Sequence, residues 1–370
     1  MSASVDNGPF DKSASPCPGD RQPARPALRS PVIFTTATTY RLWVNQPSHE
    51  PLKQAADELV STGWTRSNLT YVHRNDVQYA SPMQKQVVVV RPIVDTDAIA
   101  VGQFLHEYHN KRVPAAAWAR IIAPPWEDTA VNHGFQLLYD DSIVGVYAAI
   151  YSAREIDGER VPFCNLAAFC VLKDYRTHAI RLIRALLAQK EYIFTDLSPS
   201  GNVIAMNERL GFRHLDTGGK LVVNLPRRLR RGTRVTTDPA ALDRTLVGHD
   251  ATVYRDHRQA PAAQHLLVEH DGGHGYLMFR QDRRKRLPVF ASPLYVGGEP
   301  GCLEAAWAAV GSHLLLRYGL VATLAERRVL GFAPGPGIEL IHPRPKMFRA
   351  RQVDDEAIDY LYSELTLVQW

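Results

Sequence analysis

The sequence has no long apolar run, and this absence sets the first limit on where the protein can reside. No stretch reaches the roughly 18 uncharged apolar residues that a membrane-spanning helix needs. The start of the chain also lacks the apolar segment of a secretory signal peptide. We therefore expect a soluble protein with no membrane span, located in the cytoplasm.

Cysteine is scarce as well, and its spacing argues against two kinds of site. The chain has four cysteines, at positions 17, 164, 170 and 302, which is too few for a disulfide scaffold and lacks zinc-site spacing. The stretch HEYHN, residues 106–110, places its histidines three apart instead of the four that a helical zinc motif requires. We expect free thiols and no bound metal.

What remains is a globular composition with a modest basic excess. Hydrophobic residues make up 45% of the chain and charged residues 22%, and a length of 370 residues suits two domains. The net charge of +5 favours an anionic partner without naming one. Coenzyme phosphates, RNA and anionic lipid would all satisfy it.

Shifts in composition divide the chain into five parts. Residues 1–31 are rich in Pro, Ser and Gly and predict a disordered leader. Residues 32–84 predict a strand at 32–44 and a helix at 50–63, a unit of unclear role. We place a first domain at 85–225, an Arg-rich linker at 226–244 and a second domain at 245–370.

The order of predicted elements indicates an α/β (α+β) class with a mixed central sheet flanked by helices. From residue 85 the order is strand, two helices, three strands, helix, strand, helix and strand. The second domain loosely echoes this order, although no repeat is visible in the sequence itself. We therefore infer a duplicated architecture from element order alone.

Two stretches of the first domain carry a resemblance to a known family. They are CVLKDYRTHAIRLI at 170–183 and NERLGF at 207–212. With the element order, they resemble the GNAT superfamily of acyl-CoA N-acyltransferases over about residues 85–225. The matching positions are Val171, Tyr175, Arg176, Glu208, Leu210, Gly211 and Phe212. The second domain lacks this loop motif, and we expect a degenerate GNAT-like domain that shapes the acceptor pocket or the domain interface and does not bind coenzyme.

The physics of a helix start explains why the first stretch suits a coenzyme. The unpaired N–H groups and the positive end of the helix dipole attract a pyrophosphate, and basic side chains add to that attraction. The resemblance implies that acyl-CoA, most simply acetyl-CoA, is the co-substrate. The candidate coenzyme-binding residues are Val171, Leu172, Arg176, Thr177, His178, Ala179, Ile180 and Arg181.

The same stretch also departs from the family pattern, in which small residues let the backbone approach phosphate. Members usually have Gly where Thr177 stands, and Gly or Ala where Ala179 and Arg181 stand. Arg181 could obstruct the pyrophosphate or pair with it directly. We expect His178, Arg181 and Arg184 on one helix face and Ile180, Ile183, Leu186 and Leu187 on the buried one. A plain surface helix with solvated arginines is the alternative.

Three residues are our candidates for the chemistry. Asp196 ends a buried strand, where it could accept a proton, although capping of the following turn is the alternative. Asn165 precedes the coenzyme strand beside Cys164, which we interpret as a structural thiol. Asn207 stands where the family places a tyrosine acid. The resemblance also implies that backbone N–H groups of residues 169–172 hold the developing oxyanion.

These observations predict acyl transfer from acyl-CoA to an amine of a small molecule, sugar or peptide. Two alternatives stay open. An aminoacyl-tRNA-dependent transferase of the Fem type also pairs two such domains, and the basic balance would suit tRNA, although no aromatic stacking stripe is visible. A non-catalytic binding module would explain Asn207 and Arg181.

Overall fold

The chain divides into two compact units, Met1–Lys85 and Gln86–Trp370. The computed structural model describes residues 32–36, 39–43 and 69–70, and then 87–369 apart from 128–129, 131, 229–230, 285–286 and 352. The predicted leader at 1–31 and the predicted helix at 50–63 lie outside the described residues.

The first unit contributes three short strands. They are β1 (Val32–Thr36), β2 (Thr39–Trp43) and β3 (Leu69–Thr70). β1 pairs with β2 antiparallel, and β2 pairs with β3 parallel. The single strand predicted at 32–44 is therefore a hairpin.

The first half of the second unit follows the predicted element order closely. Its strands are β4 (Val89–Pro92), β5 (Gly134–Tyr139), β6 (Ser142–Ile156), β7 (Glu159–Val171), β8 (Ile193–Asp196), β9 (Arg213–His214) and β10 (Gly219–Val223). Its helices are η2 (Asp95–Asp97), α2 (Ala98–Tyr108), α3 (Ala115–Ala119), η3 (Lys173–His178), α4 (Ala179–Leu187) and α5 (Asn202–Arg209). The β6–β7 hairpin turns at Asp157 and Gly158, both at positive φ, as a two-residue Asp-Gly turn requires.

The second half contains the remaining elements. Its strands are β11 (Thr233–Thr236), β12 (Gln264–His270), β13 (Gly273–Arg284), β14 (Leu287–Gly298), β15 (Ala322–Glu326), β16 (Ile338–Glu339) and β17 (Met347–Arg349). Its helices are α6 (Pro239–Thr245), α7 (Gly248–His257), α8 (Cys302–Ala305), α9 (Trp307–Tyr318), α10 (Arg327–Leu330), η4 (Asp355–Ala357) and α11 (Glu364–Leu367). None of the helices in the described part of the chain is long and apolar enough to cross a bilayer.

The described strands of this unit form two seven-stranded mixed sheets flanked by helices, which confirms the predicted fold class. The first sheet has the order β4-β5-β6-β7-β8-β17-β9, and the second β11-β12-β13-β14-β15-β10-β16. Each sheet therefore contains one strand from the other half of the sequence. β10 pairs with β15, and β17 lies between β8 and β9.

This exchange of strands changes two of our expectations. The single strand expected at 212–225 is divided between the two sheets, because the chain leaves the first sheet after β9 and enters the second at β10. The segment 226–244, expected to be a linker, contains β11 and the start of α6. β10 thus precedes residue 225 but belongs to the second sheet, whereas β17 follows residue 225 but belongs to the first sheet.

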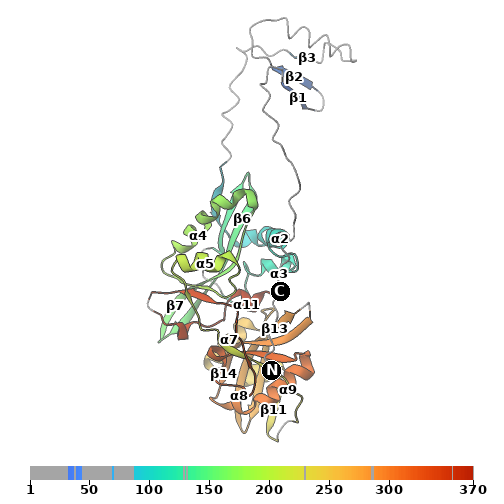
Figure 1. Cartoon of the computed structure of the whole chain (residues 1–370), viewed down its shortest axis with the longest axis vertical. Coiled ribbons are helices and arrows are strands. Elements are labelled where there is room, and N and C mark those ends of the chain that lie inside the picture. Colours follow the sequence, from blue (N-terminus) through green and yellow to red (C-terminus); the bar gives the residue numbers. More distant parts are fainter. Residues whose placement is uncertain are drawn as a thin grey trace. The chain divides into compact units, whose positions relative to one another are not determined.

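One apolar core runs from sheet to sheet through the C-terminal segment. It joins Phe163 of the first sheet to Met278 of the second by way of Tyr360, Leu361 and Leu365. Figure 1 shows α11 between the green elements of the first half and the orange elements of the second. Residues 360–368 are therefore part of the interior, where they can contribute to a site.

Candidate active site

β7 and β8 run side by side only briefly. Their parallel pairs are Phe163 with Ile193, Cys164 with Phe194 and Asn165 with Thr195. β7 then continues to Val171 with only β6 beside it. Backbone groups of residues 166–171 that point away from β6 therefore have no strand to pair with, which is unusual in the middle of a sheet.

A β-bulge marks the point where the two strands separate. Leu166 pairs with Ala149 and Ala168 with Ala148, so Ala167 is the extra residue. A bulge re-aims the strand and leaves its extra residue outside the ladder. Ala167 is half-buried and lines a cavity.

The cavity has a volume of about 690 Å³ and lies between the two sheets. On the first-sheet side its walls are Ala167, Trp118 and residues 197–200, which follow β8. On the opposite side they are residues of β13, β14 and β15 and the segment 340–346. Its size suits a small-molecule ligand, and its position places that ligand beside the bulge.

Asp196 ends β8 on the face of the sheet that α4 and α5 cover. Its side chain accepts a hydrogen bond from Asn207 Nδ2 of α5 at 2.8 Å. Burial raises the pKa of Asp196 to about 7, and the bond from Asn207 opposes that rise. Asp196 does not line the cavity, so it is a buried carboxyl held by Asn207 on the other side of the sheet.

Glu364 is a second buried carboxyl, and nothing in the sequence pattern had pointed to it. It is the first residue of α11 and has no exposed surface. Ser198, which lines the cavity, donates its hydroxyl to Glu364 Oε1 at 2.6 Å. Burial raises the pKa of Glu364 to about 7, with a smaller contribution from the charge of Asp196. Its Oε2 is buried without a hydrogen bond in the described structure.

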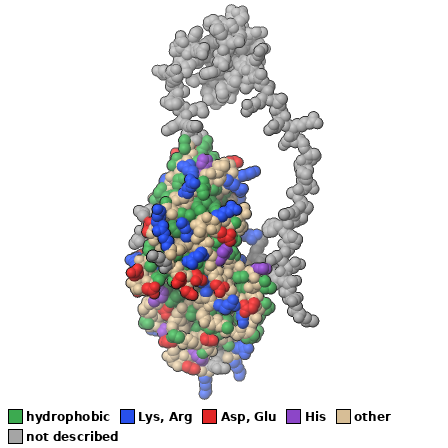
Figure 2. All heavy atoms as spheres, turned by 60° about the vertical axis from the view of Figure 1, so that its left-hand side comes forward, with side chains coloured by type: hydrophobic (Ala, Val, Ile, Leu, Met, Phe, Trp, Pro, Cys, Tyr) green, Lys and Arg blue, Asp and Glu red, His purple; other side chains and the backbone are tan. Residues whose placement is uncertain are grey.

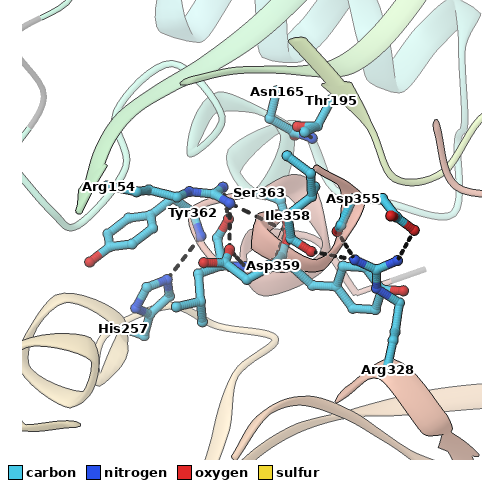
Figure 3. A network of polar contacts seen from close by, with 12 residues as sticks. Arg154, Asn165, Thr195, His257, Arg328, Asp355, Ile358, Asp359, Tyr362 and Ser363 are labelled. Carbon is cyan, nitrogen blue, oxygen red and sulfur yellow. Dashed lines mark hydrogen bonds and ion pairs between the residues drawn. The ribbon is translucent and has the colours of Figure 1, made fainter. Parts of the chain in front are cut away.

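Asn165 connects the first sheet to the C-terminal segment. Its Nδ2 donates to Thr195 Oγ1 at 3.1 Å, and its Oδ1 accepts from the Glu364 backbone N–H at 3.3 Å. Figure 3 shows Asn165 and Thr195 side by side above the C-terminal segment. Asn165 thus holds the backbone of Glu364 next to the point where β7 and β8 separate.

Arginine and histidine side chains hold the rest of this segment in place. Arg154 donates to Asp359 Oδ1 at 2.5 Å and to the Leu361 carbonyl at 2.7 Å (Figure 3). The backbone N–H of Tyr362, a residue at positive φ, donates to His257 Nε2 at 3.1 Å. Burial lowers the pKa of His257 to about 3, so this ring is neutral and can accept.

The predicted coenzyme site takes a different local form from the one we expected. The helical run starts at Lys173 with η3, and the N–H of Ala179 is bonded to the Arg176 carbonyl. Thr177, His178 and Ala179 therefore lie inside the helical run and do not form an open loop. Ile180 is exposed, contrary to expectation, because the buried face of α4 is formed by Leu182, Ile183 and Leu186.

Arg181 is held away from the helix start. Its Nη1 donates to the Val88 carbonyl at 2.6 Å, so the guanidinium ties α4 to the start of β4. Arg176, by contrast, is exposed and has no ion pair among the described residues. Figure 2, with the α4 side of the molecule turned forward, shows Lys and Arg side chains (blue) across this face. Arg176 can therefore meet an anion in solvent.

The structure brings the three predicted catalytic residues to one small region, although on two faces of the sheet. Asn165 lies on the face that meets the C-terminal segment, whereas Asp196 bonds to Asn207 of α5 on the other face. Val171 ends β7, and Leu172 directly precedes η3. Among the described residues, no three His, Cys, Asp or Glu side chains cluster so that they could hold a metal ion.

Comparison with known proteins gives likeness in structure only. No family model and no curated protein matches the sequence. A GCN5-related N-acetyltransferase from Anabaena variabilis is 13% identical, with 71% of this chain and 72% of that chain covered and a TM-score of 0.47. One from Kribbella flavida is 15% identical, with 71% of each chain covered and a TM-score of 0.44. The N-myristoyltransferase of Saccharomyces cerevisiae, solved with myristoyl-CoA, is 10% identical over 78% of this chain and 87% of its own, with a TM-score of 0.40.

Proposed function

We propose that this protein is a divergent GNAT-type enzyme that transfers an acyl group, most simply acetyl, from acyl-CoA to an amine. One observation carries the proposal: β7 and β8 separate at the Ala167 bulge, and the opening faces the cavity between the sheets. A thioester lying in this opening would meet backbone N–H groups on one side and the acceptor on the other.

The open edge of β7 supplies what the carbonyl oxygen needs. As the amine nitrogen attacks the thioester carbon, negative charge develops on that oxygen, and fixed N–H donors stabilise it. Residues 166–171 have no neighbouring strand on the β8 side. Their N–H groups that point to that side therefore form no hydrogen bonds to another strand. In the next step the C–S bond breaks and the thiolate of coenzyme A departs.

Ser198 and Glu364 are our candidates for handling the proton. The acceptor must lose a proton to attack, and the departing thiolate gains one to become a free thiol. Ser198 lines the cavity and donates to Glu364, whose pKa of about 7 suits a group that exchanges protons near neutral pH. The side chain of Asp196 lies on the other face of the sheet, where its hydrogen bond from Asn207 is better suited to positioning α5.

The decisive experiment measures thiol release from acetyl-CoA with and without a panel of amines. We expect release only when an amine is present. Titration calorimetry with coenzyme A then compares Arg176→Ala with Arg160→Ala. Arg160 lies near the opposite end of β7, eleven residues before Val171 and so about 36 Å from it at 3.3 Å per residue. Its substitution therefore removes the same charge far from η3. We expect about tenfold weaker binding for Arg176→Ala and no change for Arg160→Ala.

Other outcomes would favour the alternatives. Binding of coenzyme A without turnover on any amine would indicate a non-catalytic module. No binding of coenzyme A, together with RNA binding that falls steeply with salt, would indicate a tRNA-dependent transferase.

A further inference from the structure

The walls of the cavity carry more positive than negative charge. Among its described lining residues, four have cationic side chains and two have acidic ones. The cationic residues are Arg280, Arg283, Arg344 and Lys346, and the acidic ones are Asp282 and Glu326. Such a cavity attracts a ligand of negative charge.

Both acidic residues are already engaged by neighbouring protein groups. Asp282 Oδ1 lies 3.2 Å from Arg280 Nε. Glu326 pairs with Lys346 and accepts a hydrogen bond from the Tyr360 hydroxyl at 2.6 Å. Each of these two ion pairs is neutral by itself, and neither Arg283 nor Arg344 has an ion pair with another described residue.

One of the two cationic side chains that remain is Arg344. It is exposed, lines the cavity, and has neither an ion pair nor a side-chain hydrogen bond to any residue that the structure describes. It stands between Pro343 and Pro345, which restrict the backbone on both sides. The guanidinium therefore projects from a stiff segment, which lowers the entropy cost of using it to bind a ligand.

Arg344 also lies within electrostatic range of Arg280. Burial is the main cause that lowers the pKa of Arg280. The charges of Asp282 and Glu364 oppose this change, and the charge of Arg344 makes a smaller contribution that lowers the pKa. Two like charges at one cavity repel each other, and a bound anion would relieve that repulsion.

We propose that the amine acceptor carries an anionic group, a carboxylate or a phosphate, which Arg344 binds while the amine lies near Ser198. This inference rests on the acyl transfer proposed above and names the class of its acceptor. Arg344, Ser198 and Ala167 line one cavity of about 690 Å³, so one ligand bound in it can contact both Arg344 and Ser198. A guanidinium binds a carboxylate or a phosphate through two parallel hydrogen bonds, which gives selectivity over a neutral group.

The test uses matched pairs of acceptors that differ only in the anionic group. One pair is an amino acid and its carboxamide, and the other is an amino sugar phosphate and the unphosphorylated sugar. Thiol release gives kcat/KM for each acceptor, and thermal unfolding without coenzyme gives the stabilisation that each one causes. Both are measured for the parent, for Arg344→Gln and for Arg351→Gln, whose exposed side chain is not part of the cavity wall.

We expect roughly a tenfold preference for the anionic member of at least one pair, in line with a charge-assisted bidentate contact. The pair that shows the preference identifies the group as carboxylate or phosphate. Arg344→Gln should remove the preference by raising the acceptor KM, with the KM for acetyl-CoA unchanged, and Arg351→Gln should behave as the parent.

Equal rates within both pairs, or an unchanged preference in Arg344→Gln, would overturn the inference. If no amine supports thiol release, the proposed function fails and thermal unfolding decides about the anion site alone. A stabilisation by the anionic probes that Arg344→Gln loses would keep the site, and equal shifts in parent and variant would reject it.

Discussion

Glu364 combines three properties that are seldom found in one carboxyl group. It is fully buried, one of its oxygens has no hydrogen bond in the described structure, and the other accepts from a serine in the cavity wall. A buried carboxylate is costly, so the group retains its proton to a higher pH than an exposed glutamate does. This property can be measured through stability without knowing the substrate.

Replacing Glu364 with Gln should flatten the dependence of stability on pH. The folded pKa of about 7 lies above the ordinary value of 4.5, so the folded state keeps a proton that the unfolded chain releases between these values. This contribution to stability is complete below pH 4.5 and is lost as pH rises through 7. We compare the free energy of unfolding of Glu364→Gln with that of the parent by urea unfolding at pH 4 and at pH 8. From the lower to the higher pH, the difference should change by about 3 kcal/mol in favour of the variant.

Glu304→Gln is the matched control, because Glu304 is an exposed carboxylate on α8. We expect it to leave the pH profile of stability unchanged. A Glu364→Gln profile parallel to that of the parent would show that Glu364 is not a proton-retaining buried group.

Among the elements, the C-terminal segment from η4 to α11 decides the shape of the site. It has little regular structure, so side chains of other elements hold it through its backbone. Arg154 bonds to Asp359 and to the Leu361 carbonyl, and Arg280 bonds to the Leu365 and Val368 carbonyls at 3.1 and 3.4 Å. These contacts place α11, and Glu364 with it, against the opening of the first sheet.

Arg154→Met should destabilise the protein by about 3 kcal/mol in urea unfolding of the full chain. Methionine can still pack against the Phe163 ring, but the substitution removes the cation–π contact with that ring. It also leaves the Leu361 carbonyl without the Arg154 donor and Asp359 without its ion-pair partner. Breaking a buried ion pair from one side costs about 3 to 5 kcal/mol, and the partial exposure of Asp359 places the expected cost at the lower end.

The control for this prediction is Arg255→Met on α7. Arg255 pairs with Asp256 at 3.5 Å and is 64% exposed, so its loss should cost less than about 0.5 kcal/mol. Similar small costs for both variants would mean that Arg154 does not anchor the segment.

At the scale of the whole molecule, the two halves depend on each other through exchanged strands. β17 fills a place between β8 and β9, and β10 fills a place between β15 and β16. If either strand is removed, the neighbouring strands lose a ladder of backbone hydrogen bonds inside the sheet. The core residues that run from sheet to sheet add to this dependence.

Two fragments that divide the chain between residues 225 and 226 should therefore not fold separately. We expect no cooperative thermal unfolding from residues 1–225 or 226–370 alone, because each lacks a strand of its own sheet. The same two fragments produced together should form a complex with a single cooperative transition. A sharp transition from either fragment alone would show that the halves are independent domains.

The sequence by itself determined the class of the fold and the order of elements from β4 to α5. Local patterns were sufficient there, because hydrophobic periodicity and Asp-Gly turns act between near neighbours in the chain. The positions of the predicted strands led to Asp196 and Asn165, and the resemblance of residues 207–212 to the family motif led to Asn207. The three residues do gather where β8 ends. The local patterns did not show that Asp196 faces α5, because the face of a four-residue strand depends on its register with β7.

Only the tertiary structure decided the exchange of β10 and β17, the role of Arg181 and the position of Glu364. Arg181 bonds to Val88, 93 residues earlier, and Ser198 bonds to Glu364, 166 residues later. No local pattern encodes such contacts, because they join elements that are far apart in the sequence and meet only when the tertiary structure forms. The cavity and its charge exist for the same reason, since its walls come from both halves of the chain.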